Sequence, residues 1–371
     1  MDEKLKKIIF IVLGCFAILF LFLFIMSSCS KKITPERLEI EMVERAKDYY
    51  YIYKDELPSK NSGITLSLND LVNKGIIKDL SKTLDKNTNC SGTLTIENNN
   101  DYYMYSPSLT CTTEFETYST TNLKDILLEN VVKSGNGLHK INNAYYFRGD
   151  NVDNYLVLDG ILWRITKINS DNTIRLIEAG TREPVVWDDK YNETTTSTTG
   201  INNFYYNSLN SSILENLNNI YKDDKVLSED GKGYIKETSL CIGKRTIEET
   251  TNDGTIECSN RLDKQYLGLL QLNEYFLASL DNNCVSVNSK SCRNYNYLSE
   301  FLSSYWTLTA TEGNDSQVYK INQTVMETSA SNVGMARLVI NISENTNVTG
   351  TGTEEDPYVV SGFENELKDL Y

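Results

Sequence analysis

Cysteine residues offer the most specific side-chain chemistry in this chain. Cys15 and Cys29 lie near the N-terminus, and the other six of the eight cysteines form three sequence-local pairs, namely Cys90 with Cys111, Cys241 with Cys258, and Cys284 with Cys292. Zinc is the competing use of such thiols, but zinc sites need clustered thiolates or imidazoles. No pair has CxxC spacing, and the single histidine, His139, is distant from all of them. The spacing therefore favours three disulfides, although six cysteines allow other connectivities, and it favours an oxidising compartment.

Catalytic side chains are otherwise scarce. His139 lies in a glycine-rich segment without a neighbouring cysteine nucleophile, which excludes most histidine-assisted acyl transfer. Aspartate and glutamate are abundant, so a two-carboxylate glycosidase is compatible with the composition, but no spacing singles out a pair. No Walker or dinucleotide-binding glycine loop is present. We therefore predict a binding protein without a cofactor or a metal site, with an enzyme of unknown type as an alternative.

One aromatic residue is a candidate for ligand contact. Trp187 lies in the segment 183–190, next to the polar residues 192–200. An exposed indole at this place could stack on a sugar ring, or it could be an amphipathic aromatic at a domain edge. Trp163 and Trp306 lie in apolar runs, and we expect both to be core residues. Trp187 is therefore the predicted ligand-binding residue.

The net charge limits the classes of partner. The 371 residues carry a formal charge of −15. Nucleic-acid binding needs a basic surface, so nucleic acid is excluded as a partner. The acidity indicates solubility rather than calcium binding, because no EF-hand loop is present. The length predicts two domains.

The N-terminal residues predict the location of the protein. Residues 8–26 are uncharged and mostly apolar, and they follow a lysine-bearing start. Such a run is long enough to cross a bilayer, whereas a secretory signal core is usually shorter. We predict residues 1–7 to be cytosolic, residues 8–27 to form a transmembrane anchor, and the remainder to lie outside the cytoplasm. The sequence around Cys29 approximates a lipobox, so a lipoprotein with lipid on Cys29 is an alternative, and simple secretion is another.

Residues 34–120 predict a small domain in which one helix lies on a sheet. Thr34 is a good helix N-cap and Pro35 suits the first helical position. Apolar residues then recur at helical spacing: Leu38, Met42, Val43, Ala46 and Tyr50. A β-rich run that begins at Cys90 and a second one that leads to Cys111 predict a hairpin whose arms a disulfide would join.

This region resembles the globular part of bacterial type IV pilins and pseudopilins. The matched features are the apolar N-terminal run, the helix that follows it, the phrase at residues 68–78, and the cysteine-flanked hairpin. The chain departs from the prepilin pattern, because Gly14 lies inside the apolar run with no glutamate after it, and Pro35 interrupts a continuous helix. The resemblance implies a pilin-like domain and, as an alternative function, a structural minor component of a pilus-like or envelope assembly.

The remainder predicts a linker at residues 121–139, a larger α+β domain at residues 140–361 and a tail at residues 362–371. Apolar runs on both sides of Asp159-Gly160 predict a tight hairpin. The apolar run 267–280 predicts a helix.

Four phrases in this larger region, at residues 158–165, 266–275, 305–309 and 336–342, resemble an uncharacterised surface domain of Gram-positive gut bacteria. Its Trp-Arg and Arg-Pro signatures are similar to the C-type-lectin-like fold shared with the formylglycine-generating (sulfatase-modifying) family. Leu338 replaces the usual proline after Arg337. We expect Arg337 to be a buried or semi-buried fold determinant that pairs with a carboxylate, and a ligand-binding cation is the alternative. The resemblance implies a fold and a surface location but no activity.

The sequence thus predicts an α+β chain with a single N-terminal transmembrane helix, a small pilin-like helix-on-sheet domain and a larger C-type-lectin-like domain. The predicted function is that of a membrane-anchored extracytoplasmic binding or adhesion protein that recognises a glycan, a cell-wall polymer or a protein ligand.

Overall fold

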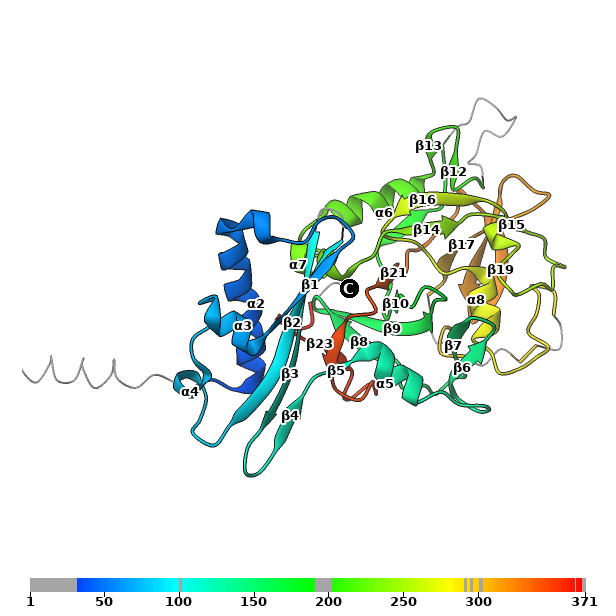
Figure 1. Ribbon diagram of the computed structural model, residues 1–371. Coiled ribbons are helices and arrows are strands. Elements are labelled where there is room, and N and C mark those ends of the chain that lie inside the picture. Colours follow the sequence, from blue (N-terminus) through cyan, green and yellow to red (C-terminus); the bar gives the residue numbers. More distant parts are fainter. Residues whose placement is uncertain are drawn as a thin grey trace, which may run out of the picture.

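The structure is a computed structural model, and it describes residues 32–99, 102–190, 202–289, 292–293, 296–299, 303–363 and 365–368. These residues form an α+β fold in which strands predominate. Their buried apolar side chains form a smaller cluster near the N-terminal end of the described chain and a larger cluster in the rest. The two parts lie side by side in Figure 1, with the smaller one in blue and cyan.

The smaller part is a helix on a four-stranded antiparallel sheet. Its elements are α2 (Pro35–Ile52), η1 (Lys54–Glu56), β1 (Gly63–Ser67), α3 (Leu68–Asn73), α4 (Leu80–Thr83), β2 (Asn89–Asn99), β3 (Tyr102–Thr112) and β4 (Thr117–Ser119), with the strand order β1-β2-β3-β4. Thr34 caps α2 by accepting a hydrogen bond from the amide of Arg37, and Pro35 opens the helix. The predicted apolar face of α2 is buried, so the 3.6-residue period correctly identified the side that packs on the sheet.

The larger part contains one sheet with the strand order β21-β10-β9-β8-β23-β22-β5, and β6 and β7 join this sheet through β9. Its elements are β5 (Thr121–Asn122), α5 (Leu123–Glu129), β6 (Gly137–Ile141), β7 (Ala144–Arg148), β8 (Tyr155–Leu158), β9 (Ile161–Ile168), β10 (Ile174–Glu178), β21 (Val339–Ile342), β22 (Asn347–Thr349) and β23 (Tyr358–Val360). Asp159 and Gly160 join β8 to β9 with φ values of 57° and 68°. Both residues are left-handed, as a two-residue type I′ turn requires, which confirms the predicted hairpin.

A second sheet has the order β11-β20-β17-β18-β19, with β15 beside β17. Its strands are β11 (Pro184–Val186), β15 (Lys244–Arg245), β17 (Tyr305–Thr311), β18 (Gln317–Asn322), β19 (Thr324–Ser329) and β20 (Val333–Met335). Two two-stranded sheets and four helical segments complete the larger part: β12 (Tyr205–Tyr206) with β13 (Leu209–Asn210), β14 (Thr238–Cys241) with β16 (Arg261–Gln265), α6 (Ser212–Lys222), α7 (Glu229–Tyr234), η2 (Glu257–Ser259) and α8 (Leu272–Leu277).

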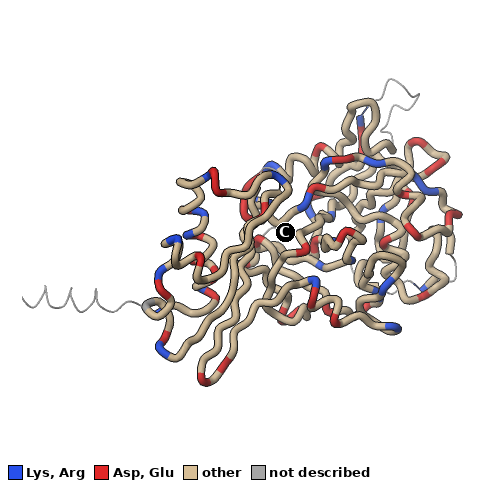
Figure 2. Tube along the Cα trace, viewed as in Figure 1, with Lys and Arg blue, Asp and Glu red and all other residues tan. Residues whose placement is uncertain are grey.

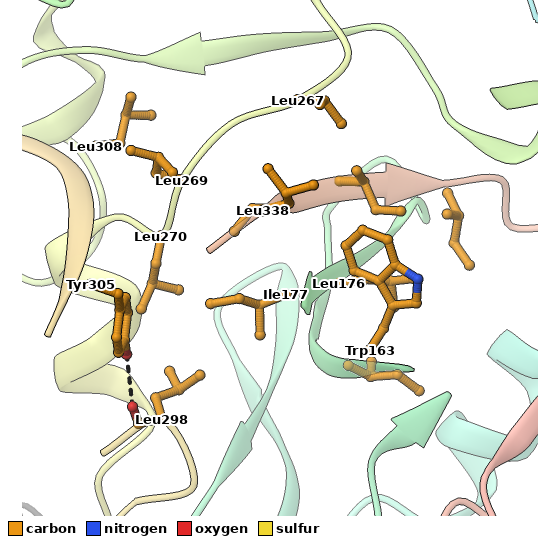
Figure 3. Packing of buried hydrophobic residues seen from close by; sticks show 14 of the residues in the cluster. Trp163, Leu176, Ile177, Leu267, Leu269, Leu270, Leu298, Tyr305, Leu308 and Leu338 are labelled. Carbon is orange, nitrogen blue, oxygen red and sulfur yellow. Dashed lines mark hydrogen bonds between the residues drawn. The ribbon is translucent and has the colours of Figure 1, made fainter. Parts of the chain in front are cut away.

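The core of the larger part is built around aromatic side chains. Trp163 and Trp306 are fully buried, as expected from their apolar surroundings in the sequence. Figure 3 shows Leu176 next to Trp163 and the hydrogen bond between Tyr305 and Leu298. The hydroxyl of Tyr305 donates to the carbonyl of Leu298 at 2.7 Å. The hydroxyl therefore keeps a partner while the ring is buried, which removes the cost of burying an unpaired polar group.

Short helix α7 connects the two parts. The amide of Asn99 donates to the carbonyl of Gly233 at 2.6 Å, and the hydroxyl of Tyr234 donates to the carbonyl of Tyr105 at 2.8 Å. A side chain on Gly233 would lie 2.4 Å from the carbonyl oxygen of Tyr103, so only glycine allows this close approach.

The predicted linker residues fold as β5, α5 and the start of β6. Leu123 and Leu127 of α5 are buried in the larger apolar cluster, and β5 pairs with β22. Residues 121–139 therefore contribute to the core of the larger part.

The predicted fold class needs correction. Within the described ranges, no helix is long and apolar enough to cross a membrane, and the fold found there is a strand-dominated α+β fold. The longest of these helices, α2, carries charged residues along its outer side because it packs one face on a sheet. The predicted anchor 8–27, with Cys15 and Cys29, lies outside the described residues.

The predicted helix at residues 267–280 is also wrong over its first half. Gly268 and Leu270 form bridges to Val339 and Thr307, and only Leu272–Leu277 is helical, as α8. Leu267, Leu269 and Leu270 are all buried, and so short an apolar run fits an extended core segment as well as a helix.

All three predicted disulfides are confirmed: Cys90–Cys111, Cys241–Cys258 and Cys284–Cys292. Cys90 and Cys111 are directly opposite each other on β2 and β3. The first disulfide therefore joins the two arms of the predicted hairpin.

Candidate functional site

Trp187 is not an exposed aromatic residue. Its side chain is 0% exposed, its indole nitrogen donates to the carbonyl of Thr307 at 3.1 Å, and its ring centre lies 5.9 Å from that of Phe204. The prediction that Trp187 presents a ring to a ligand is therefore wrong. The polar flanks of this residue suggested a surface position, but its ring packs into the larger core and its carbonyl accepts a hydrogen bond from Ile213 at the start of α6.

Two other conspicuous residues are also structural. The Nε2 atom of His139 is 2.7 Å from the carbonyl oxygen of Gly135 and the residue is buried. Arg337 is buried as expected, and its Nε donates to the backbone carbonyl of Glu178 at 2.7 Å, while its guanidinium lies 5.0 Å from the ring centre of Tyr305.

A depression of about 360 Å³ brings several polar side chains together. We call it the polar pocket and define it by six of its lining residues: Tyr146, Lys167, Arg175, Ser239, Asp253 and Asn273. Strands β7, β9 and β10 supply the first three of these residues, and β14, the segment that follows Cys241, and α8 supply the others. The pocket therefore lies where one end of the larger sheet meets the Cys241–Cys258 loop.

The floor of the polar pocket is an ionic cluster. Glu274 places Oε1 2.7 Å from the ammonium of Lys167 and 2.8 Å from Nε of Arg175. The side chains of Lys167, Arg175 and Glu274 are 14%, 7% and 2% exposed. Glu274 also accepts a hydrogen bond from the amide of Gln271, which starts α8. One carboxylate thus orients both cations and the helix that carries it.

The protonation of this cluster follows from burial and charge. Burial alone would raise the pKa of Glu274, but the attraction of Arg175 and Lys167 outweighs it and lowers the pKa to about 2. Burial lowers the pKa of Lys167, and Glu274 opposes that change. Glu274 is therefore ionised at neutral pH, and a firmly ionised carboxylate has no proton to donate as a general acid.

Buried polar atoms without a hydrogen-bonding partner gather around the pocket. Within the described part of the chain they include Oγ of Ser239 and Oδ1 of Asn273, two residues that line it, and Oε2 of Glu257, whose other carboxylate oxygen accepts a hydrogen bond from the backbone amide of Asn273. Asn273 is 2% exposed. Each such atom costs about 1–3 kcal/mol if it remains unpaired, so these positions favour a bound polar partner, either a ligand or water.

The wall of the pocket is held in place by covalent and ionic contacts. The Cys241–Cys258 disulfide closes the loop that carries Asp253. Inside the loop, Nε of Arg245 is 2.9 Å from Oε1 of Glu257, and both side chains are fully buried. The guanidinium of Arg245 also donates to the carbonyl of Glu249 at 2.9 Å. The pocket is therefore largely pre-formed, which lowers the entropic cost of binding.

A larger hollow of about 530 Å³ lies next to the Cys284–Cys292 disulfide and is lined by Phe276, Arg293 and Gln323. It lies among chain segments that include residues outside the described part. We therefore assign no site to it.

The sequence predicted only part of the polar pocket. Cys241 and Cys258 were predicted as a pair and both line the pocket. Lys167, Arg175 and Glu274 were missed. The available signal was a basic residue inside each of two apolar strand runs, because charged side chains in buried strands are rare unless they are paired.

No known protein family, curated protein or solved structure matches this chain. The resemblances to pilins and to the C-type-lectin-like fold therefore remain predictions.

Proposed function

We propose that this protein is an extracytoplasmic binding protein that holds a hydroxyl-rich glycan in the polar pocket. The observation that carries the proposal is the gathering of unpaired, buried hydrogen-bonding atoms, above all Oδ1 of Asn273, around a concave and largely pre-formed site. Sugar hydroxyls are both donors and acceptors, so one ligand can pair with the Asn273 oxygen and the Ser239 hydroxyl together. A few converging polar groups in a pre-formed pocket are typical of ligand sites.

The chemistry of the pocket supports binding more than catalysis. The carboxylate of Glu274 pairs with two cations and accepts a hydrogen bond at the start of α8. A group that transfers protons at neutral pH needs a pKa near 7, whereas that of Glu274 is about 2. The residues here are suited to holding and orienting a ligand.

The disulfides support a location outside the cytoplasm. Three intramolecular disulfides favour an oxidising compartment. The membrane association predicted from residues 8–27 concerns a segment outside the described chain, and cell fractionation tests it independently of the pocket.

The proposal is tested with the full-length, disulfide-bonded protein on an array of glycans and peptidoglycan fragments. We expect reproducible binding to one glycan class and weaker binding by Asn273→Ala, which removes the unpaired oxygen. Asn219→Ala is the matched control, because Asn219 is exposed on α6 and does not line the pocket. No binding by protein shown to be folded, or binding that Asn273→Ala leaves unchanged, would contradict the proposal.

A further inference from the structure

We infer that the glycan bound in the polar pocket carries a carboxylate, which lies against Lys167 and Arg175. This inference rests on the proposed function and adds the chemical class of the ligand. It starts from the charge of the pocket floor, where Lys167 and Arg175 share the single carboxylate of Glu274. With Lys167 protonated, as its 2.7 Å contact with the carboxylate of Glu274 favours, the buried cluster has one positive charge in excess.

Among the described residues, no second buried carboxylate lines the pocket to compensate this excess charge. The other charged residues that line the pocket are Asp171, Asp253 and Arg261, and all three are exposed. Water and salt screen charges at an exposed rim much more effectively than charges at a buried floor. Asp171 and Asp253 also each accept hydrogen bonds from a nearby threonine in their own turns. A carboxylate that enters the floor would thus meet a net positive site.

The donors at the floor are not exhausted by Glu274. An ammonium has three donor hydrogens and a guanidinium has five. Among the contacts described here, the ammonium of Lys167 pairs with Glu274, and Arg175 contacts Glu274 and the carbonyl of Leu269. The remaining N–H groups can bind a second carboxylate, and charge-assisted hydrogen bonds of this kind are about twice as strong as neutral ones.

The neighbouring groups favour a sugar acid over a simple anion. Oδ1 of Asn273 can only accept hydrogen bonds, so an inorganic anion would leave it unpaired. A sugar acid brings hydroxyl donors for Asn273 together with a carboxylate for the cations. Tyr146 adds ring surface at the same place, with its ring centre 5.4 Å from the Lys167 ammonium.

The overall charge of the chain does not provide this preference. The net charge is −15, and Figure 2 shows Lys and Arg scattered among Asp and Glu along the trace. A surface of this kind repels anions at long range. A preference for an acidic ligand must therefore come from a local site such as the Lys167–Arg175 pair.

The test compares pairs of oligosaccharides that differ only in the carboxyl group. The probes are oligomers that contain galacturonic, glucuronic or muramic acid, each beside its carboxyl-reduced counterpart. The full-length protein should bind at least one acidic member about tenfold more tightly than its reduced partner, a difference in binding free energy of about 1.4 kcal/mol. Equal binding within every pair would overturn the carboxylate but leave the proposed function intact. Absence of binding to all probes and to all arrayed glycans would overturn both.

Variants of Lys167 test whether the preference for acidic oligosaccharides arises in the polar pocket. Lys167→Gln leaves a balanced Arg175–Glu274 pair, so the protein should fold and the acidic preference should fall below about threefold, since the loss is that of a charge-assisted contact. Lys167→Arg keeps the charge and should retain the preference. Lys86→Gln is the control, because it makes the same change in net charge at an exposed residue of the smaller part. An acidic preference that survives Lys167→Gln would contradict the inference, and the comparison within pairs on the unmodified protein decides it even if that variant does not fold.

Discussion

Glu39 provides a test of how burial controls a charge in the smaller part of the molecule. This residue lies on the packed face of α2 and is 2% exposed. Its carboxyl group accepts hydrogen bonds from the hydroxyls of Tyr118 at 2.9 Å and Thr120 at 3.1 Å. Burial raises the pKa of Glu39 to about 7 from its ordinary value of 4.5, and the two hydrogen bonds only partly offset this increase. The helix therefore carries a carboxyl group that is easier to bury when it is protonated.

The magnitude follows from the difference between the folded and unfolded pKa. A change in the pKa from 4.5 to about 7 corresponds to about 3 kcal/mol of unfolding free energy, because each tenfold change in proton affinity is worth about 1.4 kcal/mol. The folded state binds the proton more tightly than the unfolded state. The stabilisation is therefore fully present below pH 4.5 and is lost as the pH rises through about 7.

Glu39→Gln removes the charge and keeps an oxygen that accepts a hydrogen bond. We expect the variant to be up to about 3 kcal/mol more stable than the unmodified protein at pH 8, and we expect this advantage to shrink at pH 5. The assay is urea unfolding of the full-length, oxidised protein at several pH values. Hydrogen exchange of the backbone amides in α2 is the readout that reports on this helix. Glu44→Gln, at an exposed position on the same helix, is the control. Parallel stability curves for Glu39→Gln and the unmodified protein between pH 5 and pH 8 would refute the reasoning.

Three further predictions concern the larger part. Replacing Cys241 and Cys258 by serine should weaken glycan binding and lower the free energy of unfolding by about 3 kcal/mol, because their disulfide closes the loop at the pocket. Titration measures the binding and urea unfolding measures the stability, and unchanged binding would show that the loop does not need the disulfide to form the pocket. Trp187→Ala should lower the free energy of unfolding by about 3–5 kcal/mol, with Trp187→Phe less harmful, since the indole is buried; a loss of binding with unchanged stability would contradict a core role. Glu274→Gln should destabilise the protein by about 3–5 kcal/mol in urea unfolding, because it leaves two buried cations without their carboxylate; a destabilisation by Lys167→Gln of the same size would show that the cations are not in excess.

Local signals in the sequence predicted several elements well. The apolar period of α2 identified its packed face because a single helix on a sheet buries one side. Asp159-Gly160 predicted a hairpin because both of its residues adopt positive φ. The cysteines that pair lie close together in the chain, so spacing alone identified the three bridges.

Features that depend on distant residues were not predictable in this way. Glu274 lies on α8, and its partners Lys167 and Arg175 lie on β9 and β10, which are about a hundred residues earlier in the chain. No periodic pattern links such positions, because the meeting is created by the packing of α8 against the end of the sheet. The prediction that Trp187 is exposed failed for a related reason, since its polar sequence neighbours do not show whether its ring points into the core or toward solvent.

The central claim is that the polar pocket binds a glycan, and calorimetric titration tests it most directly. The titrant is the oligosaccharide that gives the strongest array signal, and the proteins are the full-length chain, Asn273→Ala and Asn219→Ala. We predict saturable binding by the unmodified protein, about tenfold weaker binding by Asn273→Ala, and unchanged binding by Asn219→Ala, because Asn273 lines the pocket with an unpaired acceptor whereas Asn219 does not line it. Equal affinity of all three proteins would contradict the claim.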